Sequence, residues 1–182
     1  VAPLPPNNVM PSVSISSTGG KYIAWKYTPV SNVINITIHV TSFPIYSNFP
    51  GIVIYSPNIG NVPYDNPGSW WALLITFYNG GIYVYQPNKP VYNHIASINS
   101  SNPNYPFTFT VILTENSAGN VTVSTIYINS TAYTVNVGTP YPWSQIGYVG
   151  IRADYGNLFC VSYFAVSPSP YGGVEAFVDS VE

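Results

Sequence analysis

Strict alternation of apolar and polar residues recurs along this chain and restricts it to β-structure. In the clearest run, residues 34–41, every second side chain is apolar and the side chains between them are polar. A second run, residues 107–114, repeats the pattern with one exception, Ile112. A period of two places the apolar residues on one face of a half-buried strand. The pattern therefore predicts strands here, with Asn35 and His39 on the solvent face.

Turn residues divide the rest of the chain into short segments of the same kind. About a dozen strands spaced by roughly 8–12 residues are typical of a β-sandwich. Residues 70–78 are almost all apolar, which indicates a strand buried on both faces. Residues 86–106 are polar and are predicted to form a loop, and no segment has a helical period. The other predicted strands cover residues 12–16, 21–27, 51–55, 82–85, 121–128, 131–137, 148–153, 158–166 and 174–181.

Charge is scarce in this chain, which has four Lys or Arg and six Asp or Glu among 182 residues. Ordinary soluble domains carry about 25% charged residues, against 5% here. A net charge of −2 argues against nucleic acid as a partner, because nucleic-acid binding needs a basic face. The absence of an apolar run of about 18 residues argues against a membrane span in the mature chain. Solubility must then come from attached glycans, unless self-association is the function of the chain.

Several features predict export and modification. The start Val1-Ala2-Pro3-Leu4 is typical of a chain that follows a cleaved signal peptide, so we expect an extracellular, cell-surface location. Four Asn-X-Ser/Thr sequons are candidate attachment sites for covalent N-glycans. The candidate asparagines are Asn35, Asn99, Asn120 and Asn129. Asn35 is predicted on a polar strand face, and the others in turns or loops.

The residue types of catalysis are sparse. The six acidic residues do not form the closely spaced carboxylate pair that glycosidases on sandwich folds require. No metal-ligand spacing, nucleophile with its base, or phosphate-binding loop is present, so we predict no enzyme activity, no metal and no cofactor. Trp143, between Pro142 and Ser144, is predicted to lie in a loop. It is a candidate for stacking on a sugar ring, and core packing is the alternative.

Three segments resemble strands of concanavalin A-like jelly rolls. Residues 70–85, with Asn79-Gly80-Gly81 at the turn, look like a central hairpin of those domains. Residues 121–131 resemble their paired strands, and residues 146–166 their late strands. The resemblance implies an all-β fold, a single jelly-roll β-sandwich over residues 18–182, preceded by a Pro-rich extended tail over residues 1–17.

The nearly uncharged, Asn-, Ser-, Thr- and Tyr-rich composition, with its sequons, is similar to that of archaeal extracellular thread filament subunits. This resemblance implies a pilus-like homopolymer in which the N-terminal strand of each subunit enters the sandwich of its neighbour. Val9, Val13 and Ile15 share one parity and would be the inward anchors of the donor strand. Pro11 falls on the same face and lacks an N–H, so the ladder would be interrupted there.

A carbohydrate-binding, lectin-like module of a secreted or surface protein is the alternative function. Filaments visible by electron microscopy would favour the first reading. A monomer that binds a glycan array would favour the second.

Overall fold

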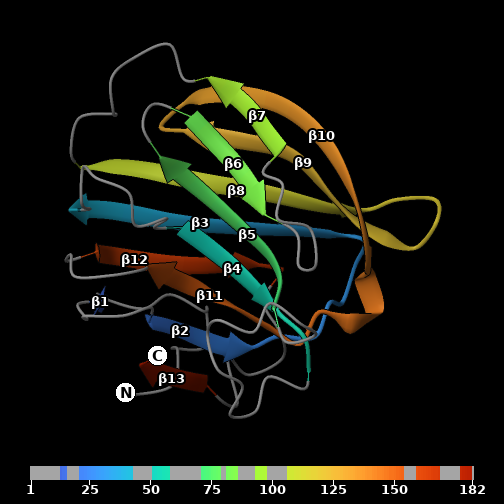
Figure 1. The fold of residues 1–182 in the computed structure, drawn as a ribbon, viewed down its shortest axis with the longest axis horizontal. Helices are drawn as coiled ribbons and strands as arrows, with labels where there is room; N and C mark the ends of the chain where they lie inside the picture. The colour runs from blue at the N-terminus through green and yellow to red at the C-terminus, as the bar shows by residue number, and fades with distance from the viewer. Residues whose placement is uncertain are drawn as a thin grey trace.

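The computed structural model is an all-β jelly-roll sandwich of two antiparallel sheets (Figure 1). It describes residues 13–15, 21–42, 51–57, 71–78, 81–85, 93–97, 106–153, 159–168 and 177–181. The β-sandwich predicted from the strand pattern and the jelly-roll class implied by the resemblance are both confirmed. The only helical element in these ranges is the short 3₁₀ turn η1, Trp143–Gln145.

One sheet has six strands in the order β1-β12-β3-β8-β9-β10. Its outermost member β1 is a three-residue strand, and β10 forms the opposite edge. The strands are β1 (Val13–Ile15), β12 (Phe159–Ser167), β3 (Val33–Ser42), β8 (Phe107–Glu115), β9 (Asn120–Ile128) and β10 (Thr131–Pro142).

The other sheet has seven strands in the order β13-β2-β11-β4-β5-β6-β7. It lies in front of the six-stranded sheet in Figure 1. The strands are β13 (Phe177–Val181), β2 (Lys21–Lys26), β11 (Tyr148–Ala153), β4 (Gly51–Tyr55), β5 (Trp71–Tyr78), β6 (Gly81–Tyr85) and β7 (Asn93–Ser97).

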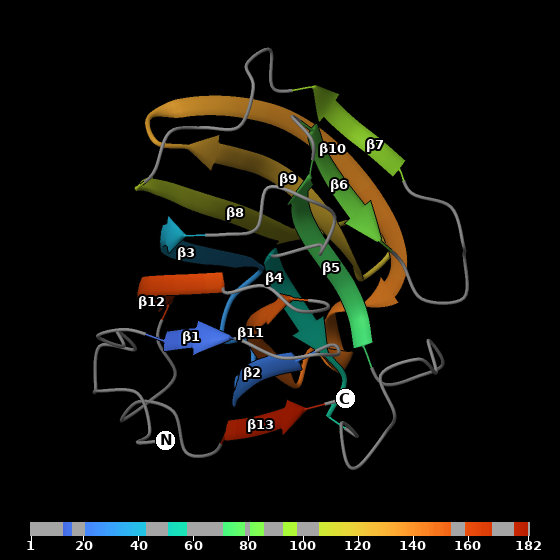
Figure 2. The ribbon, with the colours of Figure 1, turned by 60° about the vertical axis from the view of Figure 1, so that its left-hand side comes forward.

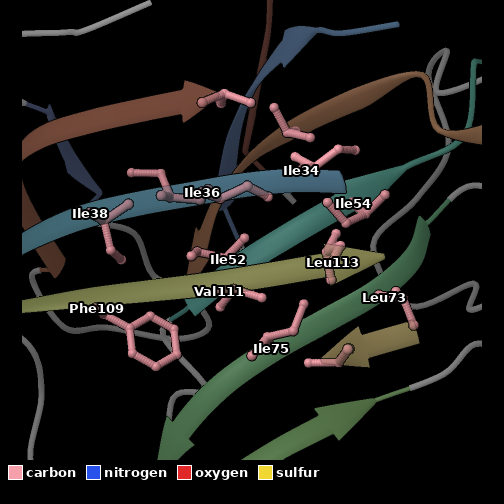
Figure 3. Close-up of a cluster of buried hydrophobic side chains, with 14 of the residues drawn as sticks. Ile34, Ile36, Ile38, Ile52, Ile54, Leu73, Ile75, Phe109, Val111 and Leu113 are labelled. Carbon is pink, nitrogen blue, oxygen red and sulfur yellow. The ribbon is translucent and has the colours of Figure 1, made fainter. Parts of the chain in front are cut away.

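The core fills the space between the sheets with aliphatic and aromatic side chains. In Figure 3 the isoleucines of β3 point toward those of β4, and the inward residues of β8 point toward β5. Ile36, Val111 and Ile75 are each 0% exposed. Full burial of such a side chain contributes about 1.5–3 kcal/mol. The alternation seen in the sequence is therefore the inward face of β3 and β8.

The prediction of a loop over residues 86–106 is wrong in part. Residues 93–97 form β7, which pairs antiparallel with β6 and so places His94 in a strand. The segment has no apolar alternation, and its strand state comes from backbone pairing at the edge of the sheet. The strand predicted for residues 131–137 is also longer than expected, because β10 continues to Pro142.

Strand β10 is long and curved, and it wraps over one side of the sandwich toward β7 (Figures 1 and 2). Its pairing with β9 is irregular between Thr134 and Val137 and again between Gly138 and Pro142. Asn136 has φ of 46°, in the left-handed region that Asn tolerates better than most residues. These irregularities bend the strand and raise its twist.

Candidate functional site

The outer face of the six-stranded sheet is a broad polar surface, which we call the threonine face. It lies on the side of β3, β8, β9 and β10 opposite the core, and all its members are half-buried or exposed. Its members are Asn35, Thr37, His39, Thr41, Thr108, Thr110, Ile112, Thr114, Thr122, Thr125, Tyr127 and Thr134. The face exists because the polar halves of several alternating strands are adjacent in one sheet.

Strand register aligns these residues in rows across the sheet. Thr37 lies opposite Thr110, and Thr110 lies opposite Tyr127 on the next strand. The Oγ1 atoms of Thr37 and Thr110 are 3.0 Å apart, which is hydrogen-bonding distance. Strands are about 4.8 Å apart, and same-face residues recur about every 6.8 Å along a strand. The face therefore presents hydroxyl groups at spacings comparable to the size of one sugar ring.

Further hydrogen bonds hold other hydroxyls of the threonine face in place. His39 Nδ1 lies 3.1 Å from Thr108 Oγ1. At the far end of the face, Asn116 Nδ2 donates to Thr122 Oγ1 over 3.2 Å. Because each Oγ1 is both a donor and an acceptor, a bonded hydroxyl keeps capacity for a ligand. The surface is thus partly organised before any ligand arrives.

The threonine face carries no formal charge apart from any proton on His39. None of its members is Asp, Glu, Lys or Arg. Across the described residues no group of three or more His, Cys, Asp or Glu could hold a metal ion. In the same ranges no helix is long and apolar enough to cross a membrane. The chemistry available on this face is therefore neutral hydrogen bonding and aromatic contact.

The outer face of the seven-stranded sheet differs at its centre, because over β4 and residues 73–76 of β5 it is withdrawn from solvent. All five residues of β4 are buried, although only Ile52 and Ile54 belong to the core between the sheets. On the opposite side of β4 and β5, Val53 is 0% exposed and Leu74 is 3% exposed. Burial on both faces was predicted for residues 70–78 and is confirmed for residues 73–76. This face offers no accessible side chain within β4 or over residues 73–76 of β5.

Trp143 does not present a ring to solvent, so its assignment as a sugar contact is wrong. It begins η1, is 5% exposed, and packs in the core. Its Nε1 donates to the carbonyl oxygen of Ser31 over 3.2 Å, and its backbone N–H donates to Gly119. The indole thus ties η1 to the β2–β3 connection, and the backbone N–H of Trp143 ties η1 to the β8–β9 turn.

The structure places three of the four sequons. Asn35 is exposed in β3, on the threonine face. Asn120 is half-buried at the start of β9, and Asn129 is exposed in the turn between β9 and β10. Asn99 lies outside the described residues. Glycan occupancy stays a prediction for all four.

Two of the proposed donor-strand residues, Val13 and Ile15, lie in β1. There they are opposite Val161 and Phe159 of β12 in the same chain. The third, Val9, lies outside the described residues, as does Pro11. Placement of this segment in a neighbouring copy stays a prediction.

The threonine face was not predicted as a site, although the spacing of its threonines is visible in the sequence. The Thr-X-Thr spacing of Thr108 and Thr110, together with Thr37, already placed hydroxyls on one side of each strand. Which strands are neighbours was missing, and only the pairing of β3 with β8 brings Thr37 beside Thr110.

The chain is similar in sequence to part of one much longer viral protein. It is 60% identical over 168 residues to the putative transmembrane protein ORF1334 of Acidianus two-tailed virus. The match covers 90% of this chain and 12% of that protein, so the chain spans about one eighth of the length of this curated relative. No protein-family model matches the sequence.

Solved structures with a similar fold include lectin-like domains. The legume lectin-like domain from Entamoeba histolytica aligns with a TM-score of 0.50 at 10% identity, covering 87% of this chain and 84% of that one. The CBM40 domain of Ruminococcus gnavus IT-sialidase, solved with α2,3-sialyllactose, has a TM-score of 0.49 at 12% identity, over 92% and 93% of the two chains. At such identities the likeness establishes the fold alone. The chain is an all-β jelly-roll sandwich with an open polar face on its six-stranded sheet.

Proposed function

We propose that this chain is a carbohydrate-binding module and that the threonine face binds neutral glycans. The observation that carries the proposal is the uncharged hydroxyl network across β3 and β8, in which Thr37 and Thr110 are 3.0 Å apart on an accessible sheet face. The lectin-like fold supports it, since the Entamoeba domain with the same architecture is named for lectins.

The chemistry of the face suits a sugar. Sugar hydroxyls, like those of threonine, donate and accept at the same time, so a row of threonines can replace the water around a glycan. Tyr127 lies opposite Thr110 and is half-buried, and it supplies an aromatic ring beside the hydroxyl row. Without fixed positive charge, the face gives no electrostatic gain to phosphate, sulfate or uronate groups.

The viral relative suggests the setting of the module. Since the matched region is 12% of a protein named as a putative transmembrane protein, the chain would be one domain of a larger surface protein. In this setting the domain faces the exterior, and no catalytic activity is assigned to it.

A glycan array with purified protein tests the proposal. We expect binding to neutral glycans that changes little between low and high salt. A Thr37→Val/Thr110→Val variant keeps the side-chain shape and should lose about tenfold in affinity, because each lost hydrogen bond contributes about 0.5–1.5 kcal/mol. Thr28→Val, which removes an exposed hydroxyl away from this face, is the matched control. Absence of neutral-glycan binding, or equal binding by both variants, would refute the proposal.

Strand exchange between copies is the second candidate function, which would make the chain a filament subunit as the composition suggested. The observation that favours it is β1, a three-residue strand at the sheet edge near the N-terminal side of the chain. A short terminal strand can be exchanged between identical copies at little cost in free energy. Exchange of β1 along a row of copies would build a homopolymer.

A cysteine placed in β1 distinguishes the two arrangements. Ser14 lies opposite Cys160, the single cysteine of the chain, in the β1–β12 pair. In a Ser14→Cys variant, oxidation should give a disulfide-linked ladder of multimers if β1 enters a neighbour. A cross-linked monomer would show that β1 stays in its own chain, which would reject this second candidate. Electron microscopy of the unmodified protein gives an independent check for filaments.

A further inference from the structure

We propose that, of the three sequons within the described residues, Asn129 is the one that is glycosylated in the folded chain, whereas Asn35 and Asn120 accept a glycan only before their strands pair. This inference is independent of the proposed function. It uses the three sequons within the described residues and compares how the fold presents their two reacting positions. These positions are the side-chain amide of Asn and the hydroxyl two residues later.

Asn129 lies where the backbone protrudes. Ile128 and Thr131 are opposite each other, so Asn129 and Ser130 form a two-residue connection between β9 and β10. Asn129 has φ of 53° and is exposed, as are Ser130 and Thr131. All three residues of this sequon are therefore accessible from solvent in the folded state.

The amide of Asn129 is also oriented by the fold. The backbone N–H of Thr108 donates to Asn129 Oδ1 over 3.1 Å, and the backbone N–H of Asn129 donates to the Thr108 carbonyl oxygen over 2.8 Å. These two bonds hold the carbonyl side of the amide against β8. The Nδ2 atom is left as the reactive end, and an N-linked glycan leaves the Oδ1 acceptor intact.

Asn35 is presented differently, although its side chain is exposed. It lies in β3, between Ser167 of β12 and Ile112 of β8, so its backbone is paired on both sides. The hydroxyl of its sequon belongs to Thr37, which is half-buried and 3.0 Å from Thr110 Oγ1. An enzyme that must bind both positions would have to open a central strand.

Asn120 is held in a similar way. It is half-buried, and its backbone N–H donates to Asn116 Oδ1 over 3.0 Å. The hydroxyl of its sequon, on Thr122, accepts a hydrogen bond from Asn116 Nδ2 over 3.2 Å. Asn116 thus engages both ends of this sequon in the folded state.

The reaction needs a lipid-phosphate-linked oligosaccharide as the glycan donor. Nδ2 of Asn129 attacks the anomeric carbon, a C–N bond forms, and the bond from that carbon to the phosphate oxygen breaks. The lipid phosphate leaves with the bonding electron pair, and the amide gives up one proton to a base. No oxidation or reduction takes place.

Protein made in bacteria without glycosylation enzymes provides a bare acceptor for the test. It is incubated with an oligosaccharyltransferase and a lipid-linked donor, either folded or denatured, and the glycopeptides are mapped by mass spectrometry. In folded protein, transfer to Asn129 should exceed transfer to Asn35 or Asn120 by at least about a hundredfold, because central strands open only with much of the global unfolding free energy. Denaturation should remove this preference.

Two variants control for side effects on folding. Thr131→Val removes only the sequon hydroxyl and should abolish transfer to Asn129 in the folded protein, while Thr131→Ser should restore it. Both should melt at the parent temperature, since Thr131 is exposed. Equal transfer to Asn35 in the folded state, or a folded chain unmodified at Asn129, would overturn the inference. If the inference holds, no glycan is added to Asn35 of the threonine face once the sheet has formed.

Discussion

The two sheets of this sandwich share one core, but their outer faces differ in solvent exposure. The six-stranded sheet exposes threonine, asparagine and histidine, with Ile112 and Val33 among the apolar exceptions. The seven-stranded sheet has Leu74 and Val53 on its outer face, 3% and 0% exposed. The six-stranded sheet thus has one buried face and one open face, whereas β4 and residues 73–76 of β5 are buried on both faces.

This difference separates positions that are needed for stability from positions that are available for binding. A strand buried on both faces is mostly apolar, as the sequence Gly-Ile-Val-Ile-Tyr of β4 is, although Thr76 of β5 is buried as well. A half-buried strand needs only alternate apolar residues, so every second position is available for another purpose. The binding surface is therefore expected on the sheet whose sequence alternates.

Replacing an apolar residue by aspartate on each of the two outer faces should give the largest difference in stability. Leu74→Asp buries a carboxylate and should destabilise the fold by several kcal/mol, lowering Tm by about 10 °C or more. Ile112→Asp, the matched change on the threonine face, should cost about 1 kcal/mol, or about 2–4 °C. Thermal melts by circular dichroism measure both. Equal losses would mean that the two outer faces do not differ as described.

Substitutions of Trp143 test whether its side chain contributes to stability alone or also to glycan binding. Trp143→Ala should destabilise the fold by about 3–5 kcal/mol, as expected for a large buried side chain. Trp143→Phe should lose less, because it removes mainly the bond from Nε1 to Ser31, worth about 1 kcal/mol. Denaturant titration gives both values. Glycan binding by the Phe variant should match the parent, and a specific loss of binding would return Trp143 to the site.

Alkaline pH should lower the free energy of unfolding, because two tyrosines with raised pKa values lose their phenol protons. Burial raises the pKa of Tyr27 to about 12, and its hydroxyl donates to the Pro168 carbonyl oxygen over 2.7 Å. Burial also raises the pKa of Tyr141 to about 12, partly offset by a hydrogen bond with Ser56.

The unfolded chain loses these phenol protons near pH 10, before the folded chain does. The contribution of the two protonated phenols to the free energy of unfolding is therefore complete below about pH 10 and is lost as the pH rises toward about 12. Denaturant titrations of the parent and of Tyr27→Phe across this range should converge as pH rises. Parallel curves would contradict a raised pKa for Tyr27.

Acidic pH should have the smallest effect on the stability of the fold. The chain has only six carboxylates, so few protons can be linked to unfolding on the acidic side. Tm should change by only a few degrees between neutral and strongly acidic pH, in contrast to the alkaline loss. A large fall would point to a structural ion pair, for which buried Arg152 is the first residue to test.

The parts of the fold that were predictable are those in which local pattern and tertiary contacts agree. The alternation of β3 and β8 fixed both their strand state and their buried faces, and the apolar run at residues 73–76 indicated burial on both sides. By contrast, β7 was missed because its strand state depends on pairing with β6. Trp143 was misjudged because its partner Ser31 is 112 residues away in the sequence.

The threonine face was predictable only residue by residue. Alternation placed Asn35 and His39 on a solvent side, but one sequence does not reveal that β3 lies beside β8 or in what register. A shift of one residue would have put Thr110 in the core. The hydroxyl row is thus a property of strand pairing, and so are the different settings of the three sequons.

The irregular edge strand β10 has a consequence for how so uncharged a protein avoids aggregation. Flat, open strand edges can template the addition of further strands, and most proteins oppose this partly with lysine or glutamate. Here the left-handed Asn136, two breaks in register and the N–H-lacking Pro140 and Pro142 make the edge a poor template. Backbone geometry performs the role that ionic repulsion usually performs. Straightening β10 by Asn136→Val would then expose a surface prone to cross-β growth.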